Sequence, residues 1–336
     1  MAYLTPVSES DTRSPIAYHQ TGSHAYPSTV SIGADKVREA LGDIPDFLIR
    51  TRDPLYDHGG RPNAWVGEPG SQCRIESASQ AAGPGGLWGD KPFRWAAETC
   101  GMYLAAAAEH LRCLGLMLDQ QGFLMSPEVI TRAIYELTMR VAWILDNEAT
   151  PRQRAARVYM ESFHGLRRAL EGYSRLWTDV AVALKHARQQ IFESDVPDLF
   201  WPNEINFGDN IPVREWSLAG ESYPSPEDIV ALLATRSEIS VREVAGMYAV
   251  LSAYVHPNPV ELQRRLVPSG DGRGQGLSVT PSHLRQLVGS SVAAFYQAYR
   301  LQATYLGWDP DVFAAWESDA GSVVPEAFSP EGEDSI

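Results

Sequence analysis

The stretch SPEVITRAIYELTMRVAWILD, residues 126–146, decides the fold class of this chain. Ser126 suits an N-cap, Pro127 suits the first helical position and Glu128 suits the first turn, so a helix is predicted to begin here. Beyond that start, the segment is apolar on most of its faces. A helix of this kind is usually buried, and the sequence therefore predicts that other helices surround it.

Similar signals mark further helices along the chain. An Ala-rich segment that ends before Gly122 carries leucines at helical spacing, and Thr-Pro pairs at 150–151 and 280–281 suit two more helix starts. No segment shows convincing strand alternation or a Gly-rich phosphate loop. The predicted fold is all-α, an antiparallel bundle of roughly five to six helices. The predicted helices cover residues 93–121, 126–146, 150–171 with a continuation toward 193, 225–235, 241–256 and 280–305.

Segments outside these helices differ in composition. Residues 1–91 are rich in Pro, Gly, Ser and Thr but also contain aromatic residues, which disordered tails usually lack. We expect this N-terminal segment to be irregular and to pack on a bundle domain that covers residues 92–316. Residues 195–226, with several prolines, are expected to form a loop insertion in that domain. The acidic residues 317–336 are expected to form a flexible tail.

Composition restricts the partners and the compartment. The chain has 336 residues and a formal net charge of −14, which argues against broad capture of duplex DNA or of an anionic membrane. Its three cysteines lack the spacing of a zinc site or a disulfide framework, and no segment is apolar for long enough to span a membrane. These features favour a globular, acidic, cytoplasmic protein.

A stripe of charged residues lies on the helix of residues 126–146. Arg132, Glu136 and Arg140 follow one another at positions i, i+4 and i+8. An exposed face with i, i+4 ion pairs is one interpretation of this spacing. The apolar character of the other faces favours an inward position instead, where each charge needs a partner.

A second stripe, formed by Tyr248, Ser252 and His256, lies on an otherwise apolar helix that ends at Pro257-Asn258-Pro259. His256 either interacts with the dipole of that helix end or belongs to a site. If both stripes face inward, they form one cluster in which a surplus arginine suits a phosphate or carboxylate. The predicted ligand-binding residues are Arg132, Glu136, Arg140, Tyr248, Ser252, His256 and Asn258.

A longer pattern runs through these helices: Pro127, Arg132-x3-Glu136-x3-Arg140-x2-Trp143-x2-Asp146, Thr150-Pro-x-x-Arg154-x-x-Arg157 and Tyr248-x2-Leu-Ser252-x3-His256. Over residues 93–305 it resembles a group of uncharacterised actinobacterial helical proteins that are similar to the HEPN superfamily. The resemblance implies a link to RNA cleavage, toxin–antitoxin pairs or phage defence, with His256, Arg132 and Arg140 as candidates for catalysis. Ribonucleases of that superfamily carry an arginine shortly before the histidine. Here Ala249, Val250 and Leu251 occupy those positions, so the nuclease motif is absent unless a neighbouring helix supplies the arginine.

An E-x-x-H sequence, Glu161 to His164, offers an alternative site, because helical di-iron proteins use this spacing. Glu109 and Glu136 on other predicted helices would complete the ligand set, and iron or manganese would be the cofactor. Such sites use two E-x-x-H sequences, and no second one occurs in this chain. Apart from this alternative, no cofactor is predicted.

Non-enzymatic interpretations remain open as well. The polar stripes can be buried ion pairs that specify the fold, with the N-terminal segment as a docking surface for another protein or a second copy. The sequence thus leaves a small anionic ligand, RNA, a protein partner or a homo-oligomer as options, and it does not decide whether the protein is an enzyme. A further basic cluster is expected to form a solvated helix face. Its members are Arg152, Arg154, Arg157, Arg167 and Arg168.

Overall fold

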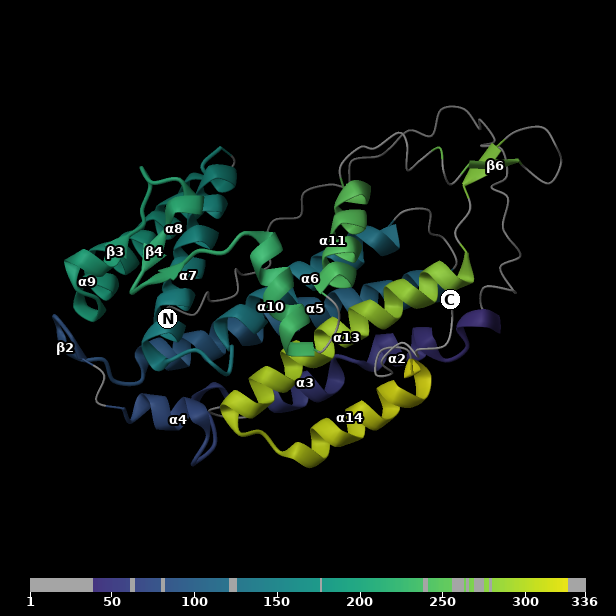
Figure 1. Cartoon of the computed structure of the whole chain (residues 1–336), viewed down its shortest axis with the longest axis horizontal. Coiled ribbons are helices and arrows are strands. Elements are labelled where there is room, and N and C mark those ends of the chain that lie inside the picture. Colours follow the sequence, from purple (N-terminus) through teal and green to yellow (C-terminus); the bar gives the residue numbers. More distant parts are fainter. Residues whose placement is uncertain are drawn as a thin grey trace, which may run out of the picture.

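The computed structural model describes residues 39–60, 64–79, 82–120, 126–175, 177–237, 241–255, 263, 266–268, 275–277 and 280–325. In these ranges the protein is an all-α helical bundle, which confirms the predicted fold class (Figure 1). The strands are short and antiparallel. None of the described helices combines the length and the apolar character that crossing a membrane requires.

The longer helices are α5 (Lys91–Gln120), α6 (Ser126–Ile144), α7 (Pro151–Tyr173), α8 (Thr178–Gln190), α10 (Pro226–Ser237), α11 (Val241–Val255), α13 (Pro281–Leu306) and α14 (Pro310–Val323). The shorter ones are α2 (Ile44–Arg50), α3 (Asp53–Gly59), α4 (Gln72–Ser77) and α9 (Val196–Leu199), with 3-10 turns at Ala64–Val66, Pro202–Glu204 and Val213–Glu215. A π-helical turn, η2, covers Ile191–Asp195. The strands are β1 (Ala82–Gly83), β2 (Gly86–Leu87), β3 (Ile205–Asn206), β4 (Ser217–Leu218), β5 (Glu221–Ser222), β6 (Leu266–Pro268) and β7 (Gln275–Leu277).

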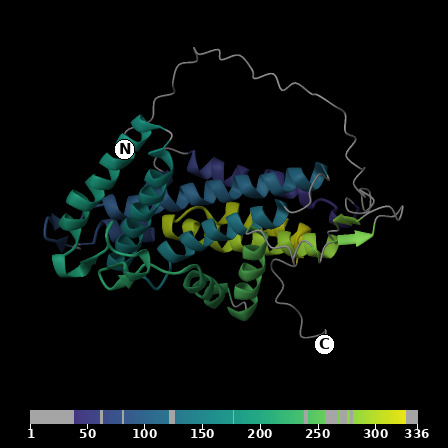
Figure 2. The same ribbon diagram turned by 90° about the horizontal axis from the view of Figure 1, so that it is seen from above.

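Helix α6 is the central element, as its composition predicts. It packs against α5 and α13, which run beside it, and α10 and α11 cover part of its remaining surface (Figures 1 and 2). Ile134, Val141 and Ile144 are fully buried. One polar contact to α13 is buried as well: the Ser291 hydroxyl donates to Thr131 Oγ1 at 3.1 Å. Helix α6 contacts these four helices because it carries apolar residues on nearly every face.

Helix α7 begins at the predicted cap. Thr150 Oγ1 accepts a hydrogen bond from the Gln153 amide, and the Gln153 side chain accepts one from the Thr150 amide at 2.9 Å, which completes a capping box. The C-terminal end of α13 is also determined by a local residue. Gly307 adopts a left-handed φ of 67° there, which an L side chain rarely does.

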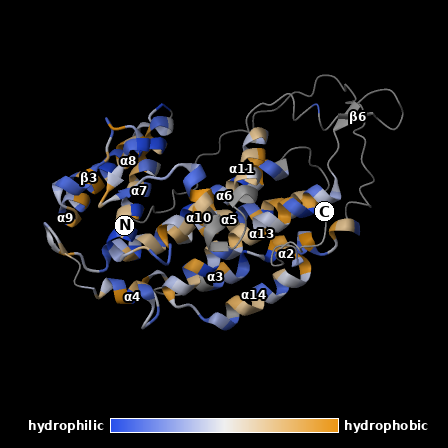
Figure 3. Cartoon of the chain, viewed as in Figure 1, coloured by the Kyte–Doolittle hydropathy of each residue, from blue (hydrophilic) through white to orange (hydrophobic). Residues whose placement is uncertain are grey.

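A lobe built from α7, α8 and residues 191–223 lies at one end of the bundle (Figures 1 and 2). We expected residues 195–226 to be a loop insertion, but they include α9 and the three-stranded sheet β3–β4–β5. Phe207 and Trp216 are buried against Phe163 of α7, with ring centroids 5.3 and 5.6 Å away. Aromatic burial, to which the proline content gives no clue, makes this segment compact. Figure 3 colours much of α7 and α8 hydrophilic blue, and Ala181 is the buried residue of α8.

The N-terminal segment packs on the bundle, but its described part is more regular than expected. Helices α2, α3 and α4 occupy it, and α2 buries Phe47 and Leu48. Gly115 allows α2 to approach α5 closely, because a Cβ atom there would lie 2.8 Å from the carbonyl oxygen of Pro45. Each of these helices has at most two turns, too few to show a helical period in the sequence.

The C-terminal boundary also differs from the expected one. Helix α14 continues to Val323, beyond residue 316 where we expected the bundle to end. Trp316 and Ala320 are buried, and Trp316 packs against Phe295 of α13 with ring centroids 5.8 Å apart. These apolar positions hold the helix on the bundle although acidic residues lie between them.

Candidate functional site

A cleft of about 410 Å³ opens between α5, α7 and α8. Its lining is mainly apolar and includes Trp95 and Tyr103 of α5, Leu166 of α7, and Ile191 of the π-helical turn. Concave, mainly apolar clefts of this volume that contain a few polar groups are typical sites for small organic molecules.

Small residues on two helices keep the cleft open. Gly165 of α7 and Ala187 of α8 both line it. A Cβ atom added at Gly165 would meet no atom within 4 Å, so the space beside this glycine is unfilled. Most helix–helix contacts are closed by larger side chains, and these two positions leave room for a ligand.

The turn η2 forms the end of the cleft. Its closing hydrogen bond runs from the Val196 amide to the Ile191 carbonyl, the i+5 spacing of a π-helix. Such turns are rare and frequently occur at functional sites. Here the turn directs both Ile191 and Asp195 to the cleft, and these side chains are only 2% and 8% exposed.

Asp195 is a buried side chain whose two carboxylate oxygens differ in their described hydrogen bonds. Its Oδ1 accepts from Lys91 Nζ at 2.6 Å and from Gln190 Nε2 at 3.3 Å. Its Oδ2 receives no hydrogen bond from the part of the chain that the structure describes. This oxygen is not one of the fully buried side-chain atoms that lack a partner, so it keeps contact with the cleft and a ligand can reach it.

A second buried carboxylate, Glu161 of α7, lies in the cleft wall. Tyr103 donates to its Oε1 at 2.6 Å, and Tyr223 donates to its Oε2 at 2.9 Å. Arg140 Nη1 lies 3.2 Å from Oε2, within ion-pair distance, although its N–H is not aligned for a hydrogen bond. His164 Nδ1 lies 2.9 Å from the same Tyr223 hydroxyl. Glu161 is thus fixed from several sides.

The protonation states of this cluster follow from burial. Burial raises the pKa of the Tyr103 and Tyr223 phenols, and the negative charge of Glu161 raises it further. Both hydroxyls therefore keep their protons and act as donors. Burial also lowers the pKa of His164, which favours the neutral ring at neutral pH.

Thr99 of α5 also lines the cleft. It is 5% exposed, and its hydroxyl has no hydrogen-bond partner among the residues that the structure describes. A helical threonine usually bonds to a carbonyl in the preceding turn, as Thr138 does with Ile134 at 2.9 Å. An unsatisfied buried hydroxyl is rare in a folded protein, which makes Thr99 an unusual member of the cleft wall.

A smaller cavity of about 170 Å³ shares Asp195 with the cleft. Lys91, Trp88 and Tyr159 also line it. Within the described part of the chain, the buried Trp88 indole N–H and the buried Tyr159 hydroxyl have no hydrogen-bond partner. The Lys91–Asp195 ion pair therefore lies beside both openings.

The structure divides the predicted polar cluster. Arg132 Nε donates to Glu136 at 2.8 Å, and its guanidinium lies 5.5 Å from the centre of the Tyr248 ring. The Tyr248 hydroxyl donates to Glu136 at 3.3 Å, so the two stripes meet here between α6 and α11. Arg140 instead reaches Glu161 on α7. The reason is geometric: positions i and i+8 of a helix differ by about 80° around its axis.

The rest of the second stripe is only partly described. Ser252 is half-buried. His256 and Asn258 lie outside the described residues, so their predicted contribution to the site stays a prediction.

The residues of the alternative metal site interact with other side chains. Glu109 pairs with Arg52 at 2.8 Å, and Glu136 pairs with Arg132 at the same distance. Glu161 is held by Arg140 and the two tyrosines, while Tyr223 lies between it and His164. Among the described residues, no group of three or more His, Cys, Asp and Glu is arranged to hold a metal ion. The donor geometry gives the iron or manganese alternative no support.

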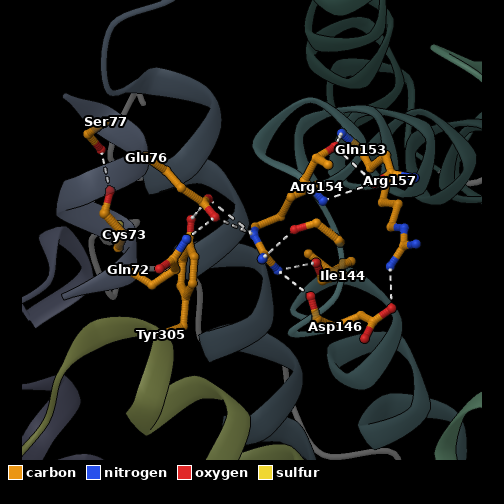
Figure 4. Close-up of polar contacts among 12 residues, drawn as sticks. Gln72, Cys73, Glu76, Ser77, Ile144, Asp146, Gln153, Arg154, Arg157 and Tyr305 are labelled. Carbon is orange, nitrogen blue, oxygen red and sulfur yellow. Dashed lines mark hydrogen bonds and ion pairs between the residues drawn. The ribbon is translucent and has the colours of Figure 1, made fainter. Parts of the chain in front are cut away.

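The basic cluster of α7 does not form a solvated face throughout, contrary to our expectation. Arg154 and Arg157 are 2% and 9% exposed. Figure 4 shows both guanidinium groups directed toward the turn between α6 and α7. Arg157 Nε donates to Glu221 at 2.7 Å and its Nη1 to the Trp143 carbonyl at 2.7 Å. These arginines hold the fold, because every charge has a partner inside it.

The sequence did not lead us to predict several residues of the cleft. Thr99 and Tyr103 are spaced i, i+4 on an Ala-rich helix, the spacing that marked the other stripes, and this signal could have identified them. Asp195 lies at the edge of the proline-rich segment and has no comparable local signal.

Comparison with protein-family models, with curated proteins and with solved structures gave no match. The resemblance to HEPN-like proteins therefore stays a prediction.

Proposed function

We propose that this protein binds a small organic molecule in the cleft between α5, α7 and α8. The observation that carries the proposal is an apolar cleft of about 410 Å³, in whose wall the buried Thr99 hydroxyl has no partner among the described residues. Apolar lining supplies most of the binding free energy at such sites, and the few polar groups fix the orientation of the ligand. The π-helical turn at one end adds a feature that is common at functional sites.

The wall of the cleft is held in place by the protein itself, which favours a binding site over a simple packing defect. Glu161 is held by Tyr103, Tyr223 and Arg140, so its position does not depend on a ligand. A ligand that enters a fixed cleft avoids the free-energy cost of ordering side chains.

The test fills the cleft and asks whether binding disappears. Gly165→Leu places a side chain in the cleft, and Gly172→Leu is the matched control. Gly172 also lies on α7 with nothing within 4 Å of its Cβ position, but it does not line the cleft. We expect naphthylethanol and hits from a fragment library to bind the wild type and Gly172→Leu in ligand-observed NMR, and to lose binding to Gly165→Leu. Binding that Gly165→Leu leaves unchanged, or no binding by any compound, overturns the proposal.

A second proposal concerns RNA, and it rests on the contact between the two polar stripes. Arg132 lies over Tyr248 and Tyr248 bonds to Glu136, which supports a shared polar surface of α6 and α11. The role would be accessory or catalytic and would involve His256. Incubation with mixed RNA tests it: RNA binding or cleavage that is lost in His256→Ala and in Arg132→Met supports the role. No binding and no cleavage by the wild type excludes it.

A further inference from the structure

We infer that the ligand of the cleft carries a cationic amino group on an apolar body. This inference rests on the proposed binding function and names the chemical class of the ligand. It follows from the charges that line the cleft, from the Oδ2 oxygen of Asp195 and from the aromatic rings beside it.

The polar lining of the cleft is acidic. Glu161 and Asp195 both line it, and none of the described lining residues is Lys, Arg or His. The cations that pair with these carboxylates, Arg140 and Lys91, are outside the lining. A ligand inside the cleft therefore meets carboxylate oxygens first, and this arrangement favours a cation over an anion.

Asp195 is the better anchor of the two carboxylates. Both oxygens of Glu161 already accept from tyrosines, whereas Asp195 Oδ2 receives no hydrogen bond from the described residues. An ammonium group is a donor with several N–H bonds and forms charge-assisted hydrogen bonds with such an oxygen. The Thr99 hydroxyl, which also has no partner among the described residues, belongs to the same cleft wall.

The competing cation occupies only one of the two oxygens. Lys91 bonds to Oδ1 of Asp195 and not to Oδ2, and the Lys91 side chain is 58% exposed, against 7% for Asp195. A ligand cation can therefore bond to Oδ2 while Lys91 stays on Oδ1, and water and salt screen the exposed ammonium group of Lys91.

The lining also suits a cation attached to an apolar group. Trp95 and Tyr103 contribute aromatic rings, whose faces attract ammonium groups, and Met102 and Leu166 contribute apolar surface. An inorganic cation would leave that surface in contact with water. An aryl-alkylamine covers it and places its nitrogen at the acidic end.

The experiment compares three probes of nearly equal shape: naphthylethylamine, naphthylethanol and naphthylacetate. Titration by isothermal calorimetry at pH 7 is expected to give the amine at least about tenfold higher affinity than the alcohol, and the carboxylate the lowest, as a charge-assisted hydrogen bond predicts. Asp195→Asn is expected to bring the amine to the level of the alcohol. Equal affinities of amine and alcohol for the wild type overturn the inference.

A second variant tests the inference even if Asp195→Asn folds poorly. Lys91→Met removes the competing cation at an exposed position, and it should raise the affinity for the amine while leaving that for the alcohol unchanged. Unchanged or lower amine affinity in Lys91→Met contradicts the inference. Failure of the inference differs from failure of the function: alcohol binding that depends on Gly165 leaves the function intact, whereas the absence of binding by every probe and fragment removes both.

Discussion

Arg154 donates from Nε to both carboxylate oxygens of Glu76, at 3.3 and 3.2 Å, and neither side chain is more than 2% exposed. This ion pair joins α7 to α4, which lies far away in the sequence. The remaining N–H groups of Arg154 bond to the carbonyls of Ile144, Asp146 and Ala149, so the guanidinium also fixes the turn between α6 and α7 (Figure 4). Tyr305 of α13 donates to Glu76 as well, at 3.0 Å.

Breaking this pair should be costly. Arg154→Met leaves the Glu76 charge buried without its cation, and we expect it to lower the free energy of unfolding by about 3–5 kcal/mol in urea titrations. The double variant Arg154→Met/Glu76→Met should lose less than the sum of the two single variants, because it leaves no unpaired charge. Additive losses would show that the two residues act independently.

A pair whose carboxylate is exposed provides the contrast. Glu136 is 49% exposed and pairs with Arg132 at 2.8 Å in the i, i+4 arrangement. Glu136→Gln should change the free energy of unfolding by no more than about 0.5 kcal/mol. A loss as large as that of Arg154→Met in the same titration would contradict this expectation.

The hydroxyl of Tyr103 should contribute to stability through Glu161. Tyr103→Phe removes the donor that lies 2.6 Å from Oε1 and should cost about 1.5–3 kcal/mol, the usual range for hydrogen bonds to charged groups. Tyr173→Phe is the control, because that side chain is 40% exposed on the same lobe. Chemical denaturation should show a change within about 0.5 kcal/mol for the control. Equal losses of stability in the two variants would show that the Tyr103 hydroxyl does not stabilise the protein through Glu161.

Two helical glycines should respond oppositely to alanine. A Cβ atom at Gly101 of α5 would overlap the ring of Trp65, so Gly101→Ala should cost about 1–3 kcal/mol through overpacking. Gly165 has free space, and Gly165→Ala should stabilise α7 by up to about 1 kcal/mol, since alanine is the better helix former. Thermal unfolding measures both, and a destabilised Gly165→Ala would show that the cleft is filled.

Acidification should destabilise the protein partly through His164. Its pKa is lowered by burial first, and the charges of Arg140, Arg168 and Arg167 lower it further against the opposing effect of Glu161. Protonation therefore favours the unfolded chain, where the ordinary pKa is about 6.5. The contribution to stability is complete above that value and is lost as pH falls through it toward the folded-state pKa.

The measurement is the melting temperature between about pH 7 and about pH 5, the range around the ordinary histidine pKa. His164→Gln should lose less stability over this interval than the wild type does, because it has no ring to protonate. Parallel curves for the two proteins would show that His164 does not contribute.

The sequence by itself indicated most of the long helices and which of them is central. Helix period and capping are local properties, so Thr150 and Gln153 mark the start of α7 without reference to the rest of the chain. Burial of α6 follows from apolar residues on nearly all of its faces. Short helices such as α2 and α4 lack enough turns to show a period, and the aromatic burial that orders residues 195–226 depends on α7.

Only the tertiary structure decided which charges meet. Arg132 and Arg140 have the same local spacing from Glu136, yet one lies by Tyr248 and the other by Glu161, because a helix turns its side chains toward different neighbours as it advances. The cleft also depends on how separate helices pack. Gly165 leaves space in a cleft that Ala187 of α8 also lines, and Asp195 lines the same cleft from a π-helical turn. Spacing along one helix fixes the face on which a residue lies, while the packing of separate helices fixes what that face meets.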